Sequence, residues 1–249
     1  MKIIVASFPK TGTKSLNAAL TILGYRVYDF LEHAYYHNKE WLEILSKGCR
    51  EQTVEMFRKM YKDIDVVLDL PACYFWEEIL EAFPEAKIVL TLRAKEDYYR
   101  SAQKQVEEIN ADWRYRLMNT VTPTGRKISS VVTQALPVVF GFKPDYRWSK
   151  IFVNETVQKL RFRQHTSHVL KHAPPEKLLV FHLKDGWGPL CDFLGLEEPN
   201  TEFPRKNRNG TAIAEFRKEN KIMMQMVKEF KVLTYISLVT VLLFFLFLM

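Results

Sequence analysis

The stretch SFPKTGTKSL, residues 7–16, decides how this chain begins to fold. It follows a short apolar run, KIIVA at residues 2–6, and leads into a helical pattern, SLNAALTILG at residues 15–24. A strand that passes through a small-residue turn directly into a helix is typical of an α/β fold. At such a turn the first N–H groups of the helix lack backbone partners and lie at the positive end of the helix dipole. The turn is therefore a candidate site for phosphate or sulfate.

The side chains of this turn suit an anion as well. Gly12 allows close approach of the backbone, and Lys10 and Lys14 supply positive charge. Hydroxyl donors come from Thr11, Thr13 and Ser15. The stretch lacks the spacing of a regular nucleotide-binding P-loop, because one residue separates Gly12 from Lys14, and it is not a GxGxxG fingerprint either. We expect a phosphate loop without Mg²⁺; the alternative is a helix cap with solvated lysines.

Strand-like and helical runs alternate along the rest of the chain. Strands are expected at residues 2–8, 25–30, 65–71, 86–93 and 176–183, and helices at 38–48, 50–62, 74–84, 95–109 and 186–196. Strands that are apolar on both faces and separated by helices predict a parallel sheet with helices on both sides, which is a three-layer α/β fold. The proline-containing stretch 110–150 is expected to be less regular.

Further polar residues follow the expected strands. Asp69 stands at the carboxyl end of strand 65–71, and Arg93 ends strand 86–93 with Ser101 eight residues later. Arg205 and Lys206 lie in a late polar loop. Because ligands of α/β sheets bind at the carboxyl ends of the strands, we expect one crevice to collect these residues. An arginine and a hydroxyl can hold a second phosphate there.

Each of these residues also has a purely structural interpretation. Asp69 can cap the end of its strand, Arg93 can pair with Glu96 or Asp97, and residues 205–209 can form an ordinary solvated loop. The histidines at 165, 168 and 172 have helical spacing, but no acidic or cysteine partner accompanies them, so a solvated helix face is expected and no metal site. The three isolated cysteines fit a reducing compartment.

Charge and composition limit the choice of partners. The formal net charge is +7, which favours phosphate-bearing ligands or acidic membranes, although a solvated lysine-rich surface explains it equally well. No nucleic-acid partner is expected. A hydrophobic content of 47% allows a sizeable core, so a globally disordered chain is excluded.

The last eighteen residues, VLTYISLVTVLLFFLFLM at 232–249, carry no charge. As a helix they would extend about 27 Å, close to the hydrocarbon thickness of an endoplasmic-reticulum bilayer. We expect a domain over residues 1–220, a juxtamembrane helix or linker over 221–231, and a single-pass anchor over 232–249, with the domain facing the cytosol. The alternative for the apolar segment is a buried C-terminal helix.

Four motifs in order give the chain a resemblance to a known family. FPKTGTKSL resembles the 5′-phosphosulfate loop of sulfotransferases that use 3′-phosphoadenosine 5′-phosphosulfate (PAPS), and Arg93 with Ser101 is similar to their 3′-phosphate motif. RKN at 205–207 looks like their Arg-Lys-Gly loop, and LKDGWGPLCDFLGL like their late helix. DLP at 69–71 fits a divergent branch, which includes a fluke enzyme that sulfates the drug oxamniquine. The resemblance covers roughly residues 3–212.

The resemblance implies a P-loop NTPase-like sulfotransferase fold, PAPS as co-substrate and a small hydroxyl- or amine-bearing acceptor. It implies Asp69 as general base, where most cytosolic members have histidine, and Lys10 as the group that stabilises the leaving phosphate. It implies donor binding by Lys10, Thr11, Gly12, Thr13, Lys14, Ser15, Arg93, Ser101, Arg205 and Lys206. Tyr28–Asp29 departs from the Tyr-His that this branch often carries, which concerns the acceptor side. Two alternatives stay open: a Mg²⁺-dependent phosphotransferase or NTPase, and a non-catalytic membrane scaffold.

Overall fold

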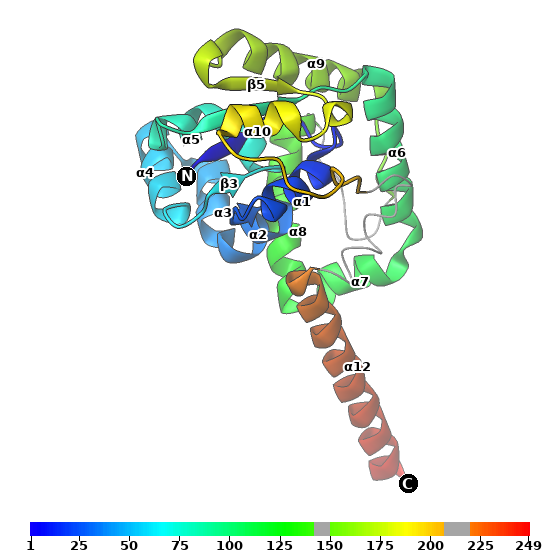
Figure 1. Cartoon of the computed structure of the whole chain (residues 1–249). Helices are drawn as coiled ribbons and strands as arrows, with labels where there is room; N and C mark the ends of the chain where they lie inside the picture. The colour runs from blue at the N-terminus through cyan, green and yellow to red at the C-terminus, as the bar shows by residue number, and fades with distance from the viewer. Residues whose placement is uncertain (142–149, 207–219) are drawn as a thin grey trace.

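A computed structural model describes residues 1–141, 150–206 and 220–249, and its centre is a five-stranded sheet (Figure 1). The strands are β1 (Ile3–Val5), β2 (Val27–Tyr28), β3 (Val66–Val67), β4 (Lys87–Thr91) and β5 (Leu178–Phe181). Their order is β2-β3-β1-β4-β5 and every pairing is parallel, with Ile4 opposite both Val67 and Ile88. The predicted α/β class with a parallel sheet is confirmed.

Helices fill most of the connections between the strands. They are α1 (Thr13–Ile22), α2 (Phe30–Tyr36), α3 (Asn38–Lys47), α4 (Arg50–Met60), α5 (Trp76–Ala82), α6 (Lys95–Ala111), α7 (Trp113–Val121), α8 (Pro123–Phe140), α9 (Glu155–His172), α10 (Gly188–Leu194) and α12 (Lys221–Leu248). Short 3-10 turns occupy η1 (Ala72–Phe75), η2 (Pro175–Lys177) and η3 (Leu183–Asp185).

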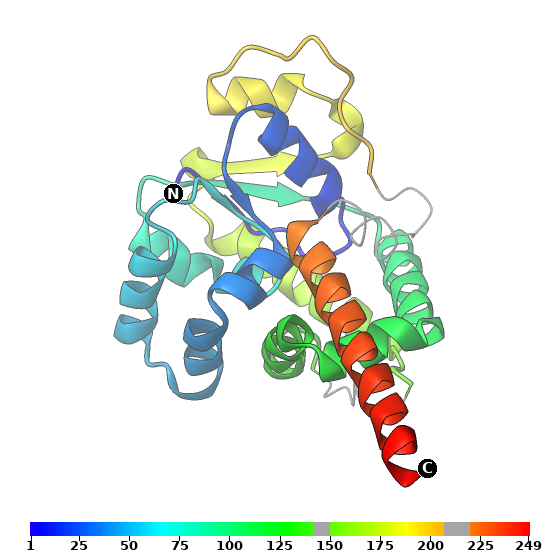
Figure 2. The same ribbon diagram turned by 90° about the horizontal axis from the view of Figure 1, so that it is seen from below.

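The two faces of the sheet bury separate cores, because successive strand residues point to opposite sides. Ile3 and Val5 of β1 pack with the buried residues of α1 and α10. Ile4 and Ala6 pack on the other side, in a larger cluster that includes residues of α2 to α5, α8, α9 and α12. The view from below shows α1 and α10 on one side of the strands (Figure 2). The predicted three layers are therefore present.

Residues 110–150 are more regular than their sequence predicts. The helices α7 and α8 cover residues 113–121 and 123–140, and the structure does not describe residues 142–149. Pro123 occupies the first turn of α8, where a missing N–H costs nothing, and the Thr122 side chain accepts a hydrogen bond from Gly125 N at 2.9 Å. Burial of residues such as Ile128, Val131 and Ala135 keeps α8 helical through Pro137. The expectation of irregular structure was wrong because Pro123 stands in the first turn of α8, where proline is compatible with a helix, and packing holds the helix through Pro137.

The first turns of the last helix, α12, pack in the domain, and the rest of the helix extends beyond it. Ile222, Met223 and Met226 are buried in the larger core, whereas residues 231–238 and 240–249 are exposed. α12 projects from the base of the domain, beside α7 and α8 (Figure 1). Among the described residues it is the one helix long and apolar enough to cross a membrane by length and composition. It runs unbroken through residue 231, and the division of the chain at residues 220 and 231 stays a prediction.

Candidate active site

Three adjacent strands bring the predicted residues to one edge of the sheet. The loop after β1 carries Lys10, the end of β3 leads to Asp69, and the end of β4 leads to Arg93. β1 lies between β3 and β4, and the chain crosses from β3 past β1 to β4. Such a change of winding direction opens a crevice at the carboxyl ends of the strands.

The loop after β1 contains two residues with positive φ, Lys10 and Gly12. Gly12, which precedes α1, has a φ of 106°, and a Cβ there would lie 2.0 Å from the Leu183 side chain. Lys10 also has a positive φ, 71°. The Thr11 hydroxyl donates to Phe8 O at 2.7 Å and lies 2.6 Å from the Thr91 hydroxyl of β4. The loop is thus fixed by contacts of its own, and the first turn of α1 faces the crevice.

Asp69 is both a strand-end cap and a group that faces the crevice. Its φ is 64°, and a cis peptide bond joins Leu70 to Pro71. The Oδ1 atom accepts a hydrogen bond from Leu70 N at 2.8 Å, which is the cap that the sequence left open as an alternative. The Oδ2 atom lies 3.5 Å from Thr13 Oγ1 and 3.7 Å from Lys14 Nζ. One oxygen therefore holds the backbone while the other lies against α1.

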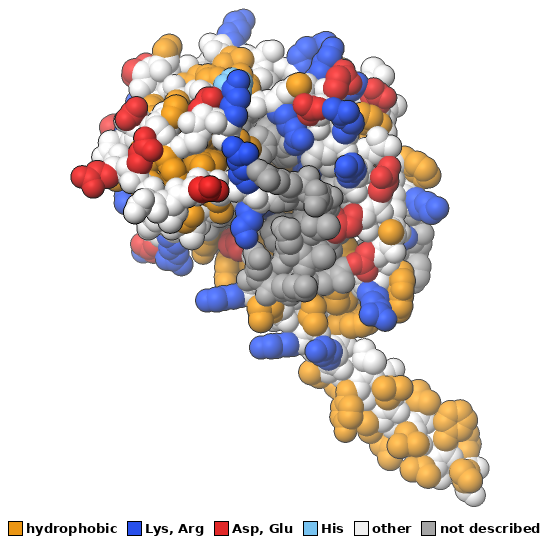
Figure 3. Space-filling model, turned by 45° about the vertical axis from the view of Figure 1, so that its right-hand side comes forward, with side chains coloured by type: hydrophobic (Ala, Val, Ile, Leu, Met, Phe, Trp, Pro, Cys, Tyr) orange, Lys and Arg blue, Asp and Glu red, His pale blue; other side chains and the backbone are white. Residues whose placement is uncertain are grey.

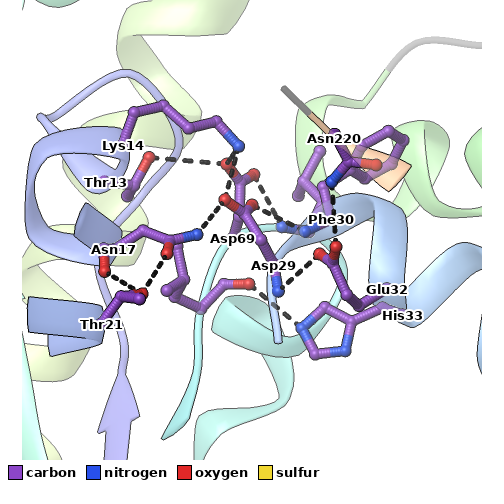
Figure 4. Close-up of polar contacts among 12 residues, drawn as sticks. Thr13, Lys14, Asn17, Thr21, Asp29, Phe30, Glu32, His33, Asp69 and Asn220 are labelled. Atoms are coloured by element: carbon purple, nitrogen blue, oxygen red, sulfur yellow. Dashed lines mark hydrogen bonds and ion pairs between the residues drawn. The ribbon is translucent and has the colours of Figure 1, made fainter. Parts of the chain in front are cut away.

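Lys14 lies between two carboxylates (Figure 4). Its Nζ is 2.6 Å from Asp29 Oδ2, closer than it is to Asp69. Asp29 also accepts from Asn17 Nδ2 at 2.8 Å and, through Oδ1, from Phe30 N at 2.7 Å. The resulting cluster ties α1, the start of α2 and the end of β3 together behind the loop.

The pKa values of the two carboxylates in this cluster, Asp29 and Asp69, are shifted in opposite directions. Burial raises the pKa of Asp69, and the nearby charge of Asp29 raises it further, against the opposing effect of Lys14. Burial alone would raise the pKa of Asp29 too, but its contact with the Lys14 ammonium and its other hydrogen bonds lower that pKa overall. The pKa of Lys14 is raised, because the two carboxylates outweigh the effect of burial. Of the pair, Asp69 is thus the carboxylate that holds a proton more readily.

Arg93 and Lys10 bring two positive charges to the same crevice. Arg93 Nη1 donates to Lys10 O at 2.7 Å, and neither of its anticipated partners binds it: Glu96 pairs with Lys159 and Asp97 with Arg100. Burial lowers the pKa of Lys10, with Asp69 acting in the opposite sense. Within the described residues no hydrogen bond or ion pair engages the Lys10 ammonium. A half-buried cation without such a partner is suited to an anionic ligand.

One cavity of about 1110 Å³ collects the residues that the sequence predicted for the site. Every residue that the sequence singled out for the site lines it: Lys10, Thr11, Gly12, Thr13, Lys14, Ser15, Asp69, Arg93, Ser101, Arg205 and Lys206. Lys206 N donates to Ser15 Oγ at 2.9 Å, which brings the late loop onto the first turn of α1. Asn207, the third residue of the RKN motif, lies outside the described residues.

The rest of the cavity wall is largely apolar, and two of the helices that form it, α7 and α8, were not predicted from the sequence. Side chains from α6, α7, α8 and α12 line it, among them Val106, Ile109, Tyr115, Ile128, Val132, Leu136 and Met223. Asp69 therefore lines a cavity that also has cationic groups and an apolar wall. The cationic groups of the cavity could be predicted from the sequence, whereas the helical wall from α7 and α8 could not, because residues 110–150 were expected to be irregular.

Two further expectations change with the structure. His165 does not lie on a solvated face: its Nε2 is 2.8 Å from Ala6 O, its ring stacks on Tyr74 and it is buried. Burial lowers the pKa of His165 to about 4, so the ring is a neutral part of the core. The pairing of Asp29 with Lys14 was not predicted either. A signal was present in the sequence, because an aspartate follows Tyr28 where the related branch often has a histidine. Among the described residues no group of three His, Cys, Asp or Glu side chains is placed to hold a metal ion.

Comparison with known proteins agrees with this geometry. Residues 2–212 match the sulfotransferase domain family, and the chain belongs to that family. A curated relative, "Ava biosynthesis cluster protein M" of Aspergillus versicolor, is 30% identical over 213 residues, which cover 82% of this chain and 80% of the relative. Membership makes this protein a transferase of the sulfotransferase type, with a small-molecule acceptor.

Proposed function

We propose that this protein moves the sulfuryl group of PAPS to a hydroxyl or amine of a small, lipophilic acceptor. The observation that carries the proposal is that Asp69, a buried carboxylate with a raised pKa, lines one cavity together with cationic groups and an apolar wall. A sulfotransferase needs an anion site for its donor, a base for its acceptor and a place for both to meet.

The cationic end fits the donor. The N–H groups at the start of α1, with the hydroxyls of Thr13 and Ser15, would hold the 5′-phosphosulfate, which supplies the activated sulfuryl group. Arg93 and Ser101, with Arg205 and Lys206 of the late loop, would hold the 3′-phosphate. Lys10 would stabilise the negative charge that develops on the leaving phosphate.

Asp69 would act as general base. Its Oδ1 atom accepts a hydrogen bond from Leu70 N, and its Oδ2 atom, 3.5 Å from Thr13 Oγ1 and 3.7 Å from Lys14 Nζ, would take the proton of an acceptor hydroxyl. The raised pKa brings the carboxylate closer to the proton affinity that a base needs near neutral pH. In this scheme Lys14 keeps Asp69 and Asp29 together at the end of the loop, and its contribution to donor binding is through charge.

The apolar end would bind the body of the acceptor. The walls from α6, α7, α8 and α12 offer mostly hydrocarbon surface, which favours a lipophilic molecule. The relative from Aspergillus versicolor is named for a biosynthesis cluster, which supports a small-molecule substrate for this chain as well. The apolar part of α12, residues 232–249, would anchor the protein in an endoplasmic-reticulum type membrane with the domain in the cytosol.

The donor site can be tested without knowing the acceptor. In detergent, 3′-phosphoadenosine 5′-phosphate at a hundred times its Kd should stabilise the full-length protein by about 2.7 kcal/mol, which thermal unfolding detects readily. ADP and ATP with Mg²⁺ should stabilise it much less, because neither carries a 3′-phosphate.

Arginine variants assign this selectivity to the proposed residues. Arg93→Ala should remove the preference for the 3′-phosphate, whereas Arg100→Ala, at an exposed arginine of α6 that pairs with Asp97, should keep it. A larger shift with ATP and Mg²⁺, or none with any nucleotide, would favour an NTPase or a non-catalytic scaffold instead.

A further inference from the structure

From residue 220 onward, the start of α12 is held directly against the domain. Asn220 caps α12, since its Oδ1 accepts from Ile222 N at 2.9 Å, and its Nδ2 donates to Glu32 Oε1 at 3.0 Å (Figure 4). Glu32 in turn accepts from Asp29 N in the cluster behind the active site. The start of α12 is thus fixed against α2 as well as buried in the core.

A second contact fixes the point at which α12 leaves the domain. The carboxylate of Glu229 accepts from Thr124 N at 2.9 Å and from Thr124 Oγ1 at 2.7 Å, in the first turn of α8. The uncharged segment begins at Val232, three residues further along the same helix, which is about 4.5 Å. The headgroup layer on each side of a bilayer is about 5–7 Å thick. If Val232 enters the hydrocarbon, the first turn of α8 lies in the headgroup layer.

The side chains around this point suit such a position. Arg126 and Lys127 are exposed in α8, and Lys228 and Lys231 are exposed on α12. Lys and Arg side chains gather with apolar ones around the base of the domain where α12 leaves it (Figure 3). We call the four basic residues the basal patch. The carboxylate within it, Glu229, is engaged by Thr124.

The helix beside the patch adds an aromatic residue of the kind found at membrane interfaces. Trp113, at the start of α7, is 63% exposed, and the Arg114 guanidinium lies 5.6 Å from its ring. α7 packs against both α8 and α12, so this pair belongs to the same side of the domain. Tryptophan and basic residues together are typical of segments that rest on a bilayer surface.

We propose that the basal patch and Trp113 dock the domain on the surface of a membrane that contains anionic lipids. The partner is the lipid headgroup layer of the bilayer that holds α12, so the inference rests on the proposed anchor. Docking would place the outer sides of α7 and α8 against the membrane. Their inner sides carry Tyr115 and Ile128, which line the apolar end of the cavity. The cavity would then be held next to the phase in which a lipophilic acceptor dissolves.

The proposal is tested on the full-length protein in vesicles. A fluorophore is attached at Ala111→Cys, an exposed position at the end of α6 beside α7, in a Cys49→Ser background. Cys73 and Cys191 are buried and stay unlabelled. The control carries the fluorophore on natural Cys49, which is exposed before α4. Energy transfer to labelled headgroups should be stronger from residue 111 than from residue 49, and stronger in vesicles with phosphatidylserine than in phosphatidylcholine alone.

Charge variants then distinguish a specific effect of the basal patch from a general effect of the protein's net positive charge. Each basic residue near an anionic surface contributes roughly a fivefold preference for it, so Arg126→Gln with Lys127→Gln should lower the ratio of docked to undocked protein roughly 30-fold. The matched control, Arg163→Gln with Lys171→Gln, removes the same charges from exposed positions on α9, at the far end of the domain from α12 (Figure 1). It should leave the ratio unchanged.

Resistance of the protein to alkaline extraction reports separately whether α12 is inserted. If the protein is inserted, any one of three results would overturn docking while the anchor stands. These are equal energy transfer from residues 111 and 49, no change in transfer with phosphatidylserine, and equal effects of the two pairs of charge variants. Extraction of the full chain from vesicles would refute both the anchor and the docking.

Discussion

Asp29 and Asp69 should respond to removal of their charge in opposite ways, although they lie around the same lysine. The variants are Asp29→Asn and Asp69→Asn, each nearly equal in size to the natural residue. Lys14 Nζ is 2.6 Å from Asp29 and 3.7 Å from Asp69. The measured quantity is the midpoint of thermal unfolding between pH 4 and pH 8.

Asp29 has a pKa below its ordinary value, so its charge stabilises the folded state above the unfolded pKa, and this stabilisation is lost as the pH falls through the folded pKa. Its carboxylate and the Lys14 ammonium are largely buried, with side chains 8% and 23% exposed. Removing one partner of a buried pair costs about 3–5 kcal/mol, and we expect about 3 because Lys14 keeps Asp69 nearby. For a chain of this size that lowers the midpoint by roughly 6–12 °C at pH 7.

Asp69 has a pKa above its ordinary value, because burial penalises its charge. The ionised carboxylate therefore reduces the stability of the folded state once the pH exceeds the unfolded pKa, about 3.9. An asparagine keeps an oxygen for Leu70 N and carries no charge. Asp69→Asn should leave the midpoint unchanged or raise it at pH 7, with no gain near pH 4.

The assay is scanning fluorimetry of the full-length protein in detergent across this pH range. From pH 8 down to pH 5 the deficit of Asp29→Asn should stay nearly constant, because its stabilisation is lost only below the unfolded pKa of about 3.9. Any gain of Asp69→Asn should appear as the pH rises above about 3.9 and reach its full size above the raised folded pKa. A loss of several degrees in both variants at pH 7 would refute the assignment of Asp69 as the carboxylate with the raised pKa.

Two further outcomes concern the activity and the loop. The activity is measured with an acceptor identified from a panel of apolar alcohols, phenols and amines. Asp69→Asn should lower kcat by about 10²–10⁴-fold while the KM for PAPS changes little. A kcat within about tenfold of that of the natural protein would exclude Asp69 as the base. Gly12→Ala should weaken stabilisation by 3′-phosphoadenosine 5′-phosphate, because its φ of 106° is strained for alanine and its Cβ would push aside the Leu183 side chain, 2.0 Å away. Gly24→Ala, with a φ of 84° and no atom within 4 Å of its Cβ, is the control for backbone strain alone, and equal loss in both variants would contradict the steric explanation.

Local patterns in the sequence determined the parallel sheet and the cationic end of the site. Apolar runs separated by helical periods predict strands covered on both faces, and each strand end then places its next residues at the same edge. Lys10, Asp69 and Arg93 could be assigned to one crevice for this reason, and all three line one cavity. The apolar C-terminal segment was equally visible, because its signal is composition over a continuous stretch.

Only the tertiary structure decided which groups meet across elements. Lys14 could be assigned to the anion loop from its spacing, but its position between Asp29 and Asp69 depends on how α1, α2 and β3 pack. His165 was read as exposed from helical spacing, since that spacing does not say which face is covered; Ala6 and Tyr74 cover it. The burial of the start of α12 was not predicted for the same physical reason. Burial and pairing depend on contacts between residues distant in sequence, which local periodicity does not encode.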